Sequence, residues 1–463
     1  MNYDMIVIGS GPGGYVAAIR AAQFGMKTAV IEQAEVGGIC LNWGCIPTKS
    51  LLKSAQVLEY GKRAAEFGVK MGGVAPDFGA IVARSREVAG KMSRGVQFLF
   101  KKRGIVLIEG RGRLTADRNV EVTTAAGEKK VLAADHIVLA TGARSRELPN
   151  LPQDGQRVIG YRQALTLERL PGSMMVVGSG AIGSELAFFY QTMGTRVTLV
   201  EFMPNILPLE DEEVSKQVTR SFKKIGMEVL VKSSVESAER DGDQMKVQIK
   251  NKRGEIEEHR ADILLSAVGI TPNIEDIGLE EAGVAVENGR VKVDDHYRTN
   301  VEGVYAIGDL IPGPSLAHVA SAEGVRCVEF IAGEEVTPLD YSAIPGCTYT
   351  TPEVASVGLN EAKAVEAGFK VRVGKFILSA SGKATAAGAN DGFAKLVFNA
   401  ADDTLLGAHL VGLNVTEMIA GLVLAKRLKL TARDIIQTVH PHPTISEAIM
   451  EAAAASHGEV IHL

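Results

Sequence analysis

The strongest constraint on the fold of this chain is a pattern that occurs twice. Residues 3–32 read YDMIVIGSGPGGYVAAIRAAQFGMKTAVIE, and residues 172–201 read GSMMVVGSGAIGSELAFFYQTMGTRVTLVE. Each segment begins with a short apolar strand, passes through G-x-G-x-x-G into a helical stretch, and ends in a second apolar strand closed by a glutamate. This order predicts two βαβ units, and therefore two domains of the α/β class.

The glycines of the two fingerprints are candidate ligands of a pyrophosphate. They are Gly9, Gly11 and Gly14 in the first unit, and Gly178, Gly180 and Gly183 in the second. The first glycine makes a tight turn, the second lets the backbone approach the phosphates, and the third lets the helix pack closely on the strand. The amino terminus of the helix then offers free N–H groups and a positive dipole end. A single fingerprint is weak evidence, but two complete units favour two dinucleotides.

The closing glutamates indicate which dinucleotides these are. Glu32 follows Gly9 by 23 residues (32 − 9), and Glu201 follows Gly178 by the same number (201 − 178). A carboxylate at this position accepts hydrogen bonds from a ribose diol and repels a ribose 2′-phosphate. The sequence therefore predicts two dinucleotides without a ribose phosphate.

Length and charge exclude several other classes of protein. A chain of 463 residues is too long for one ordinary core. Its formal net charge is −5, and no concentrated basic tract is present, so nucleic acid is not an expected partner. The chain enters an apolar strand almost at once, which leaves no room for a signal peptide, and no apolar stretch is long enough for a membrane span. We therefore expect a cytoplasmic protein without membrane insertion.

Two of the four cysteines lie close together, in GGICLNWGCIPTKS at 37–50. Cys40 and Cys45 allow three interpretations: a structural disulfide, half of a zinc site, or a redox-active pair. A reducing cytoplasm disfavours the first, and no second ligand set at metal spacing supports the second, so we expect no metal. A cysteine at a helix start, as Cys45 is predicted to be, has a stabilised thiolate, which leaves Cys40 for thiol exchange. Cys327 and Cys347 are expected to be buried, inert thiols.

These motifs together resemble those of the pyridine nucleotide–disulfide oxidoreductase family. The likeness covers the whole chain and rests on the two fingerprints, the cysteine segment, Ala-Thr-Gly at 140–142, Gly308-Asp309, and HPHPTISE at 440–447. It implies an α/β fold with two Rossmann-like dinucleotide-binding domains plus a C-terminal α+β dimerisation domain. The implied boundaries are 1–145 for the first part of the FAD domain, 146–274 for the NAD domain, 275–345 for the second part of the FAD domain, and 346–463 for the interface domain.

The resemblance also implies the cofactors, one FAD per subunit and NAD, and further residues that contact them. On the FAD side these are Lys49, Gly112, Thr141, Gly142, Asp309 and Ala317, in addition to the first fingerprint and Glu32. On the NAD side they are Glu185, Val235 and Gly269, in addition to the second fingerprint and Glu201. Lys49 is expected near the flavin and paired with Glu185, although an ordinary solvated lysine remains the alternative.

The segment HPHPTISE supplies the remaining catalytic candidates by the same resemblance. His442 and Glu447 match the His–Glu pair of the family, whereas His440 is expected to be inert. A carboxylate on one ring nitrogen fixes the tautomer and raises the basicity of the other nitrogen. With Cys40 and Cys45, this pair would oxidise a dithiol of the dihydrolipoamide kind and pass the electrons through FAD to NAD.

The implied partners are a second copy of the chain, in a homodimer, and the lipoyl domains of a 2-oxo acid dehydrogenase acyltransferase or of the glycine cleavage lipoyl protein. Alternatives are a mercuric reductase, a glutathione-type reductase or a non-catalytic lipoyl-binding subunit. The chain ends SHGEVIHL, without the terminal cysteine pair of mercuric reductases. Glu201 disfavours the NADPH of glutathione-type enzymes.

The sequence departs from the family at two positions. Ile270 stands where an arginine often follows the glycine, so no cation is available there to steer NAD. Trp43, the only tryptophan, replaces a residue that is often small and apolar, and it either reports on the redox state or simply packs.

Overall fold

A computed structural model of the chain describes residues 2–463 and divides into two compact units. The first unit comprises Met1–Ser50, Val82–Arg146 and Ile270–Tyr341. The second comprises Leu51–Ile81, Glu147–Gly269 and Ser342–Leu463. None of the helices described in residues 2–463 is long and apolar enough to cross a membrane.

The first unit is built on a seven-stranded sheet with the order β3-β2-β1-β6-β5-β4, to which β19 is added beside β6. Its strands are β1 (Asn2–Ile8), β2 (Thr28–Glu32), β3 (Val106–Glu109), β4 (Arg111–Leu114), β5 (Val120–Thr123), β6 (Lys129–Leu139) and β19 (Val304–Ala306). Val7 of β1 pairs in parallel with Val30 of β2 and Val138 of β6, and all three are fully buried. Apolar runs without alternation fold in this way because both faces of the sheet are covered.

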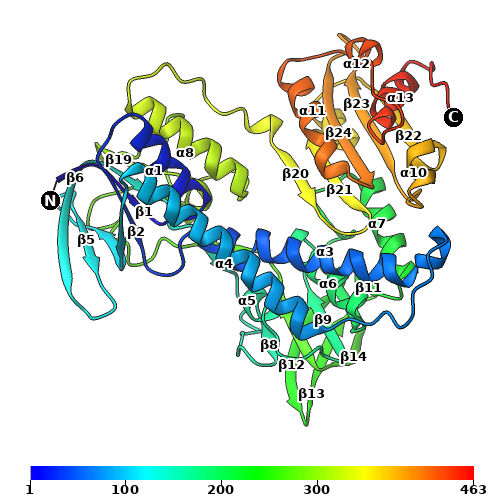
Figure 1. Ribbon diagram of the computed structural model, residues 1–463, viewed down its shortest axis with the longest axis horizontal. Coiled ribbons are helices and arrows are strands. Elements are labelled where there is room, and N and C mark those ends of the chain that lie inside the picture. The colour runs from blue at the N-terminus through cyan, green and yellow to red at the C-terminus, as the bar shows by residue number, and fades with distance from the viewer. Residues whose placement is uncertain (1) are drawn as a thin grey trace. The chain divides into compact units, whose positions relative to one another are not determined.

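Helices cover this sheet, and α1 (Pro12–Gln23) and α8 (Ala317–Ile331) lie side by side (Figure 1). Their contact depends on small residues: a Cβ placed on Gly324 would lie 2.7 Å from the backbone oxygen of Gly13. The other elements of this unit are α2 (Gly38–Trp43), β7 (Ala143–Ser145), β16 (Ile270–Pro272), β17 (Val286–Glu287), β18 (Arg290–Val291) and the 3₁₀ helix η2 (Gly308–Leu310). Helices α3 (Cys45–Lys62) and α4 (Phe78–Arg103) each run through both units.

The second unit contains a parallel five-stranded sheet with the order β11-β10-β9-β15-β8. Its strands are β8 (Val158–Ile159), β9 (Ser173–Val177), β10 (Arg196–Glu201), β11 (Glu228–Val231) and β15 (Ile263–Ser266). The antiparallel strands β12 (Ser234–Asp241), β13 (Gln244–Lys250) and β14 (Ile256–Ala261) form a separate sheet. The helices here are α5 (Tyr161–Ala164), α6 (Ala181–Met193) and α7 (Glu212–Lys224), with the 3₁₀ helix η1 (Ala64–Phe67). The β9–α6–β10 unit repeats β1–α1–β2, which confirms the predicted pair of Rossmann-like units.

The carboxy-terminal part of the second unit is an antiparallel sheet with the order β20-β21-β24-β23-β22, flanked by helices (Figure 1). Its strands are β20 (Pro345–Thr348), β21 (Glu353–Gly358), β22 (Val371–Ile377), β23 (Phe393–Asn399) and β24 (Leu405–Gly412). Its helices are α9 (Glu361–Glu366), α10 (Gly382–Ala386), α11 (Val415–Arg427), α12 (Ala432–Gln437) and α13 (Glu447–Ser456), with the short η3 (Tyr341–Ala343) and η4 (Leu378–Ala380). This arrangement confirms the expected α+β domain.

A buried lysine ties the carboxy-terminal sheet of the second unit to helices α7 and α9. Lys395 of β23 is almost fully buried, and its ammonium lies 3.1 Å from Asp211, 2.8 Å from Glu213 and 3.1 Å from Glu361. Asp211 is also the N-cap of α7, because its side chain accepts the N–H of Glu213. Although burial lowers the pKa of Lys395, its hydrogen bonds to these carboxylates raise it above the ordinary value overall.

Replacing this lysine is expected to destabilise the second unit strongly. Lys395→Met leaves the buried Asp211 and the exposed Glu361 without their shared cation, while Glu213 keeps only Lys375, and this costs about 3–5 kcal/mol of unfolding free energy. Denaturant unfolding followed by circular dichroism measures the loss. Lys375→Met is the matched control, because Lys375 pairs with Glu213 near the surface, and about 1 kcal/mol or less is expected there. Equal losses in both variants would contradict the role assigned to Lys395.

Candidate functional site

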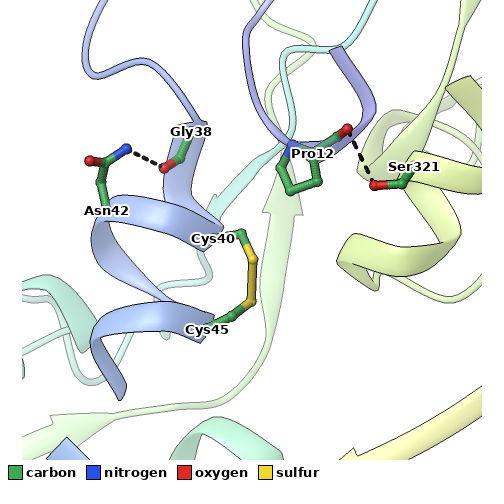
Figure 2. Close-up of a disulfide and its surroundings, with 6 residues drawn as sticks. All are labelled: Pro12, Gly38, Cys40, Asn42, Cys45 and Ser321. Carbon is green, nitrogen blue, oxygen red and sulfur yellow. Dashed lines mark hydrogen bonds between the residues drawn. A yellow bond between two sulfur atoms is a disulfide. The ribbon is translucent and has the colours of Figure 1, made fainter. Parts of the chain in front are cut away.

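A disulfide joins Cys40 and Cys45, with their Cα atoms 4.8 Å apart. Figure 2 shows Cys40 on α2 and Cys45 at the first turn of α3. Both cysteines are partly exposed. Cys45 is the first residue of an 18-residue helix, so the free N–H groups and the positive dipole end of α3 favour a thiolate at this sulfur.

The segment before the cysteines is anchored on the first fingerprint loop. The N–H of Gly37 donates to the backbone oxygen and to the hydroxyl of Ser10, each at 3.1 Å. Gly38 has a φ of +60°, and a Cβ at this position would lie 2.7 Å from the Cα of Gly11. The Asn42 amide donates to the oxygens of Val36 and Gly38, each at 3.0 Å, and Figure 2 draws the second bond. The disulfide and the fingerprint loop therefore form one local structure.

The first fingerprint has the geometry of a phosphate-binding turn. Gly9 has a φ of +101°, and a Cβ there would lie 2.3 Å from the backbone oxygen of Ala140. A Cβ on Gly14 would lie 1.9 Å from the oxygen of Gly9, so helix and strand pack too closely for a side chain. A Cβ on Gly11, in contrast, would meet no protein atom within 4 Å. The middle glycine therefore faces open space at the start of α1, as a bound pyrophosphate requires.

The second fingerprint repeats this geometry at the start of α6. Gly178 has a φ of +95°, and its Cβ would lie 2.5 Å from the oxygen of Ala267. A Cβ on Gly183 would lie 2.0 Å from the oxygen of Gly178, whereas one on Gly180 would meet nothing within 4 Å. The residues present fit two dinucleotides, one in each unit.

The two closing glutamates are held in the same way, by a serine that the sequence analysis did not single out. One oxygen of Glu32 accepts the N–H of Ser10 at 2.9 Å and its hydroxyl at 2.6 Å. One oxygen of Glu201 accepts the N–H of Ser179 at 2.9 Å and its hydroxyl at 2.5 Å. The sequence itself pointed to these serines, because both fingerprints read Gly-Ser-Gly.

The second oxygen of each glutamate is also bonded to the backbone. In Glu32 it accepts the N–H of Ala34 at 2.9 Å, and in Glu201 it accepts the N–H of Met203 at 2.7 Å. Glu201 is buried, whereas Glu32 is partly exposed. Each carboxylate thus has a defined orientation at the end of its strand, beside the first turn of its fingerprint.

The other FAD-side candidates lie in the first unit. For some of them, the structure also shows a packing or hydrogen-bonding role that does not involve FAD. Thr141 donates its hydroxyl to the oxygen of Asn273 at 2.7 Å, and Gly142 has a φ of +67° with open space around it. A Cβ on Gly112 would lie 3.1 Å from side chains of the sheet, so packing alone accounts for this glycine. Asp309 lies in η2, where burial raises its pKa and Arg290 partly opposes that shift. Ala317 is the first residue of α8.

The candidates on the NAD side lie in the second unit. Val235 is buried, and its carbonyl already accepts the amide of Asn150 at 2.7 Å. Gly269 has a φ of +114° and open space around it. Glu185 lies on α6 and accepts the N–H of Tyr349 at 3.0 Å. Its pairing with Lys49, which lies on α3, stays a prediction.

The histidine and glutamate of the HPHPTISE segment form a bonded pair. Nδ1 of His442 lies 2.8 Å from Glu447, whose other oxygen accepts the N–H of Thr444 at 2.8 Å. Although burial raises it, these hydrogen bonds hold the pKa of Glu447 below its ordinary value. The His442 side chain is 79% exposed within its own chain, so its Nε2 is available to another molecule. His440 bonds instead to the backbone oxygen of Thr438.

The remaining cysteines differ from each other. Cys327 is fully buried in the core of the first unit, and burial raises the pKa of its thiol. The expectation of burial is wrong for Cys347, which is partly exposed because β20 lies at the edge of its sheet.

Ile270, which stands where the family often has an arginine, lies in β16 and pairs with Ser145 of β7.

Comparison with known families covers nearly the whole chain. Residues 3–324 match the pyridine nucleotide-disulphide oxidoreductase family, and residues 344–453 match the dimerisation domain of the same family.

Individual relatives agree with this match. The chain is 47% identical to the dihydrolipoyl dehydrogenase of Zymomonas mobilis, over 100% of this chain and 99% of the relative. It is 45% identical to that of Rhizobium etli, with the same coverage. Among solved structures, LpdA from Mycobacterium tuberculosis superposes with a TM-score of 0.90 at 29% identity, over 97% of this chain and 98% of that one.

Proposed function

Because the chain belongs to the pyridine nucleotide-disulphide oxidoreductases, and within them to the dihydrolipoyl dehydrogenase family, we propose that it oxidises protein-bound dihydrolipoamide to lipoamide while NAD is reduced. The observation that carries this proposal is the Cys40–Cys45 disulfide, which lies at the amino end of α3 and is anchored on a dinucleotide-binding loop. A second such loop, closed by Glu201, supports a separate site for NAD.

In the first half of the proposed reaction, a thiolate of the substrate attacks the sulfur of Cys40. The bond between the cysteines breaks, a mixed disulfide forms at Cys40, and Cys45 leaves as a thiolate. The second substrate thiol then attacks the mixed disulfide, which closes the lipoamide ring and releases the sulfur of Cys40. His442 accepts the proton of the first thiol at Nε2, since Glu447 holds the opposite ring nitrogen, and the proton of the second thiol passes to the released sulfur of Cys40.

The second half returns the cysteines to the disulfide. FAD, when bound, supplies a two-electron carrier between the dithiol pair and NAD. The first fingerprint and Glu32 would hold FAD, and the second fingerprint and Glu201 would hold NAD. The amino end of α3 keeps the charge of the Cys45 thiolate in place until its electrons leave.

We also propose the division of the chain into residues 1–145, 146–274, 275–345 and 346–463, and a homodimer formed through the last of these. Separate hydrophobic clusters in the FAD-side, NAD-side and carboxy-terminal regions support the division. The match to a dimerisation domain supports the dimer. Lipoyl domains of a 2-oxo acid dehydrogenase complex or of the glycine cleavage system are the proposed partners, and the cytoplasm is the proposed location.

One set of assays tests the function. Purified protein should contain FAD and should reduce NAD with dihydrolipoamide. It should reduce NADP far more slowly, and it should leave glutathione disulfide unreduced. A protein that reduces glutathione disulfide with NADPH would overturn the proposal in favour of a glutathione-type reductase. A protein without FAD or turnover would favour a lipoyl-binding subunit.

The choice of nucleotide is expected to depend on Glu201. Glu201→Gln removes the charge that repels a ribose 2′-phosphate and weakens the hydrogen bonds to the ribose diol. The preference for NAD over NADP should narrow by about 1–3 kcal/mol. The ratio of kcat/KM for the two nucleotides measures this change.

The matched control is Glu32→Gln, which alters the equivalent carboxylate of the first fingerprint. This variant should release FAD more readily and should keep the wild-type ratio of kcat/KM for NAD and NADP. An unchanged ratio in Glu201→Gln would show that another residue discriminates between the nucleotides.

A further inference from the structure

Arg86 of α4 contacts Asn42 and Trp43, two of the residues that lie between Cys40 and Cys45. Its Nη1 donates to the backbone oxygen of Asn42, and its guanidinium carbon lies 4.1 Å from the ring centroid of Trp43. Arg86 is 44 residues from Asn42 along the chain, so the contact is tertiary. It belongs to neither fingerprint nor to the histidine pair.

The position of this contact matters because of how α2 ends. Helix α2 finishes at Trp43, so the Asn42 carbonyl belongs to its last turn, where carbonyls lack intrahelical donors and form a negative dipole end. Cys45 follows Trp43, the last residue of α2, by only two residues. The end of α2 therefore opposes a thiolate at Cys45, whereas the start of α3 favours one.

A cation at the end of α2 offsets this opposition. Burial lowers the pKa of Arg86, and the carboxylate of Glu35 opposes that shift. A guanidinium nevertheless stays protonated at neutral pH. Its guanidinium lies over the face of the Trp43 ring, which adds a cation–π contact that holds the group beside the loop. A small apolar residue at position 43 would offer no such face.

We infer that Arg86 is a positioning residue for the redox pair: it caps α2, holds Trp43 in place, and favours the thiolate that forms when the Cys40–Cys45 disulfide is reduced. The inference rests on the proposed redox role of these cysteines. In this reduction a dithiol gives up two electrons and becomes a disulfide, and the sulfur–sulfur bond of the protein breaks. Cys40 then holds a proton, and Cys45 keeps its charge while the other proton passes to His442 and then to solvent.

The test measures thiolate formation without catalytic turnover. The FAD-loaded protein is reduced with dithiothreitol, desalted without oxygen, and treated with iodoacetamide across a range of pH, and mass spectrometry follows alkylation of each cysteine. Arg86→Gln keeps a hydrogen-bond donor but removes the charge. The alkylation rate of Cys45 at neutral pH should fall about twofold to fivefold, and its pH profile should move to higher pH.

Three further variants separate charge from general damage. Arg86→Lys should restore most of the Cys45 rate, because it returns a cation to the same place. Arg94→Gln removes an arginine from the exposed side of the same helix and should behave as the wild type. Trp43→Val should lower the rate less than Arg86→Gln, since the bond to the Asn42 carbonyl remains possible.

The outcomes distinguish this inference from the function on which it rests. Coincident pH profiles for Arg86→Gln and the wild type would overturn the role of Arg86 and leave the proposed function standing. A fall that Arg86→Lys does not reverse would reduce Arg86 to a structural contact and would also overturn it. A wild-type disulfide that dithiothreitol does not reduce would count against the proposed function itself.

Discussion

Cys45→Ser is expected to lose dihydrolipoamide oxidation by about a thousandfold or more while FAD stays bound. A serine in this place cannot form the disulfide that accepts electrons from the substrate, and its hydroxyl is not a thiolate at neutral pH. The fingerprint glycines and Glu32, and not the cysteine sulfurs, form the predicted cradle for FAD. This variant should therefore lose turnover while it keeps its FAD.

Steady-state turnover with dihydrolipoamide and NAD measures the loss, and the ratio of flavin to protein absorbance measures retention. Cys347→Ser is the control, because it changes a partly exposed cysteine outside the disulfide and should keep its turnover. Cys40→Ser should also be inactive, although it retains the Cys45 sulfur at the start of α3. Near-normal oxidation by Cys45→Ser would remove the pair from the mechanism.

Two inactive variants are expected to regain activity when their subunits mix. His442→Gln alone should lower turnover by about a hundredfold or more, because the substrate thiol loses its proton acceptor. Within its own chain His442 is 79% exposed, while Glu447 holds its ring in a defined orientation. If the histidine serves the disulfide of the partner subunit, each active site needs residues from two chains.

The mixing experiment follows from this arrangement. In a dimer of one Cys45→Ser chain and one His442→Gln chain, one site has both functional residues and the other has neither. Random mixing of equal amounts makes about half of the dimers mixed, so about a quarter of wild-type activity should return. Turnover after dissociation and re-association, with differently tagged subunits to report exchange, measures the recovery.

The control is the doubly substituted chain mixed with the wild type. Each such mixed dimer should have no intact site, because one chain lacks both residues and each site needs one residue from each of the two chains. If exchange is demonstrated and the two single variants regain no activity, the histidine and the cysteines of a site belong to the same chain.

Features that depend on neighbouring residues were determined by the sequence. The two βαβ units follow from apolar runs and glycine spacing, and the start of α3 at Cys45 follows from the segment around it. The bond between His442 and Glu447 spans only five residues, so the local turn and helix start bring the two side chains together. Such patterns are visible in the chain because the groups that create them lie within a few turns of one another.

Only the tertiary structure decided which distant groups complete these local features. Gly37 donates a hydrogen bond to Ser10, 27 residues away in the chain, and Arg86 donates one to Asn42, 44 residues away. Lys395 donates one to Asp211, 184 residues away. No periodicity or spacing encodes such pairs, because they depend on how sheets and helices pack after each element has formed. For the same reason the burial expected of Cys347 was wrong, since its exposure depends on β20 lying at the edge of a sheet rather than on the residues beside it.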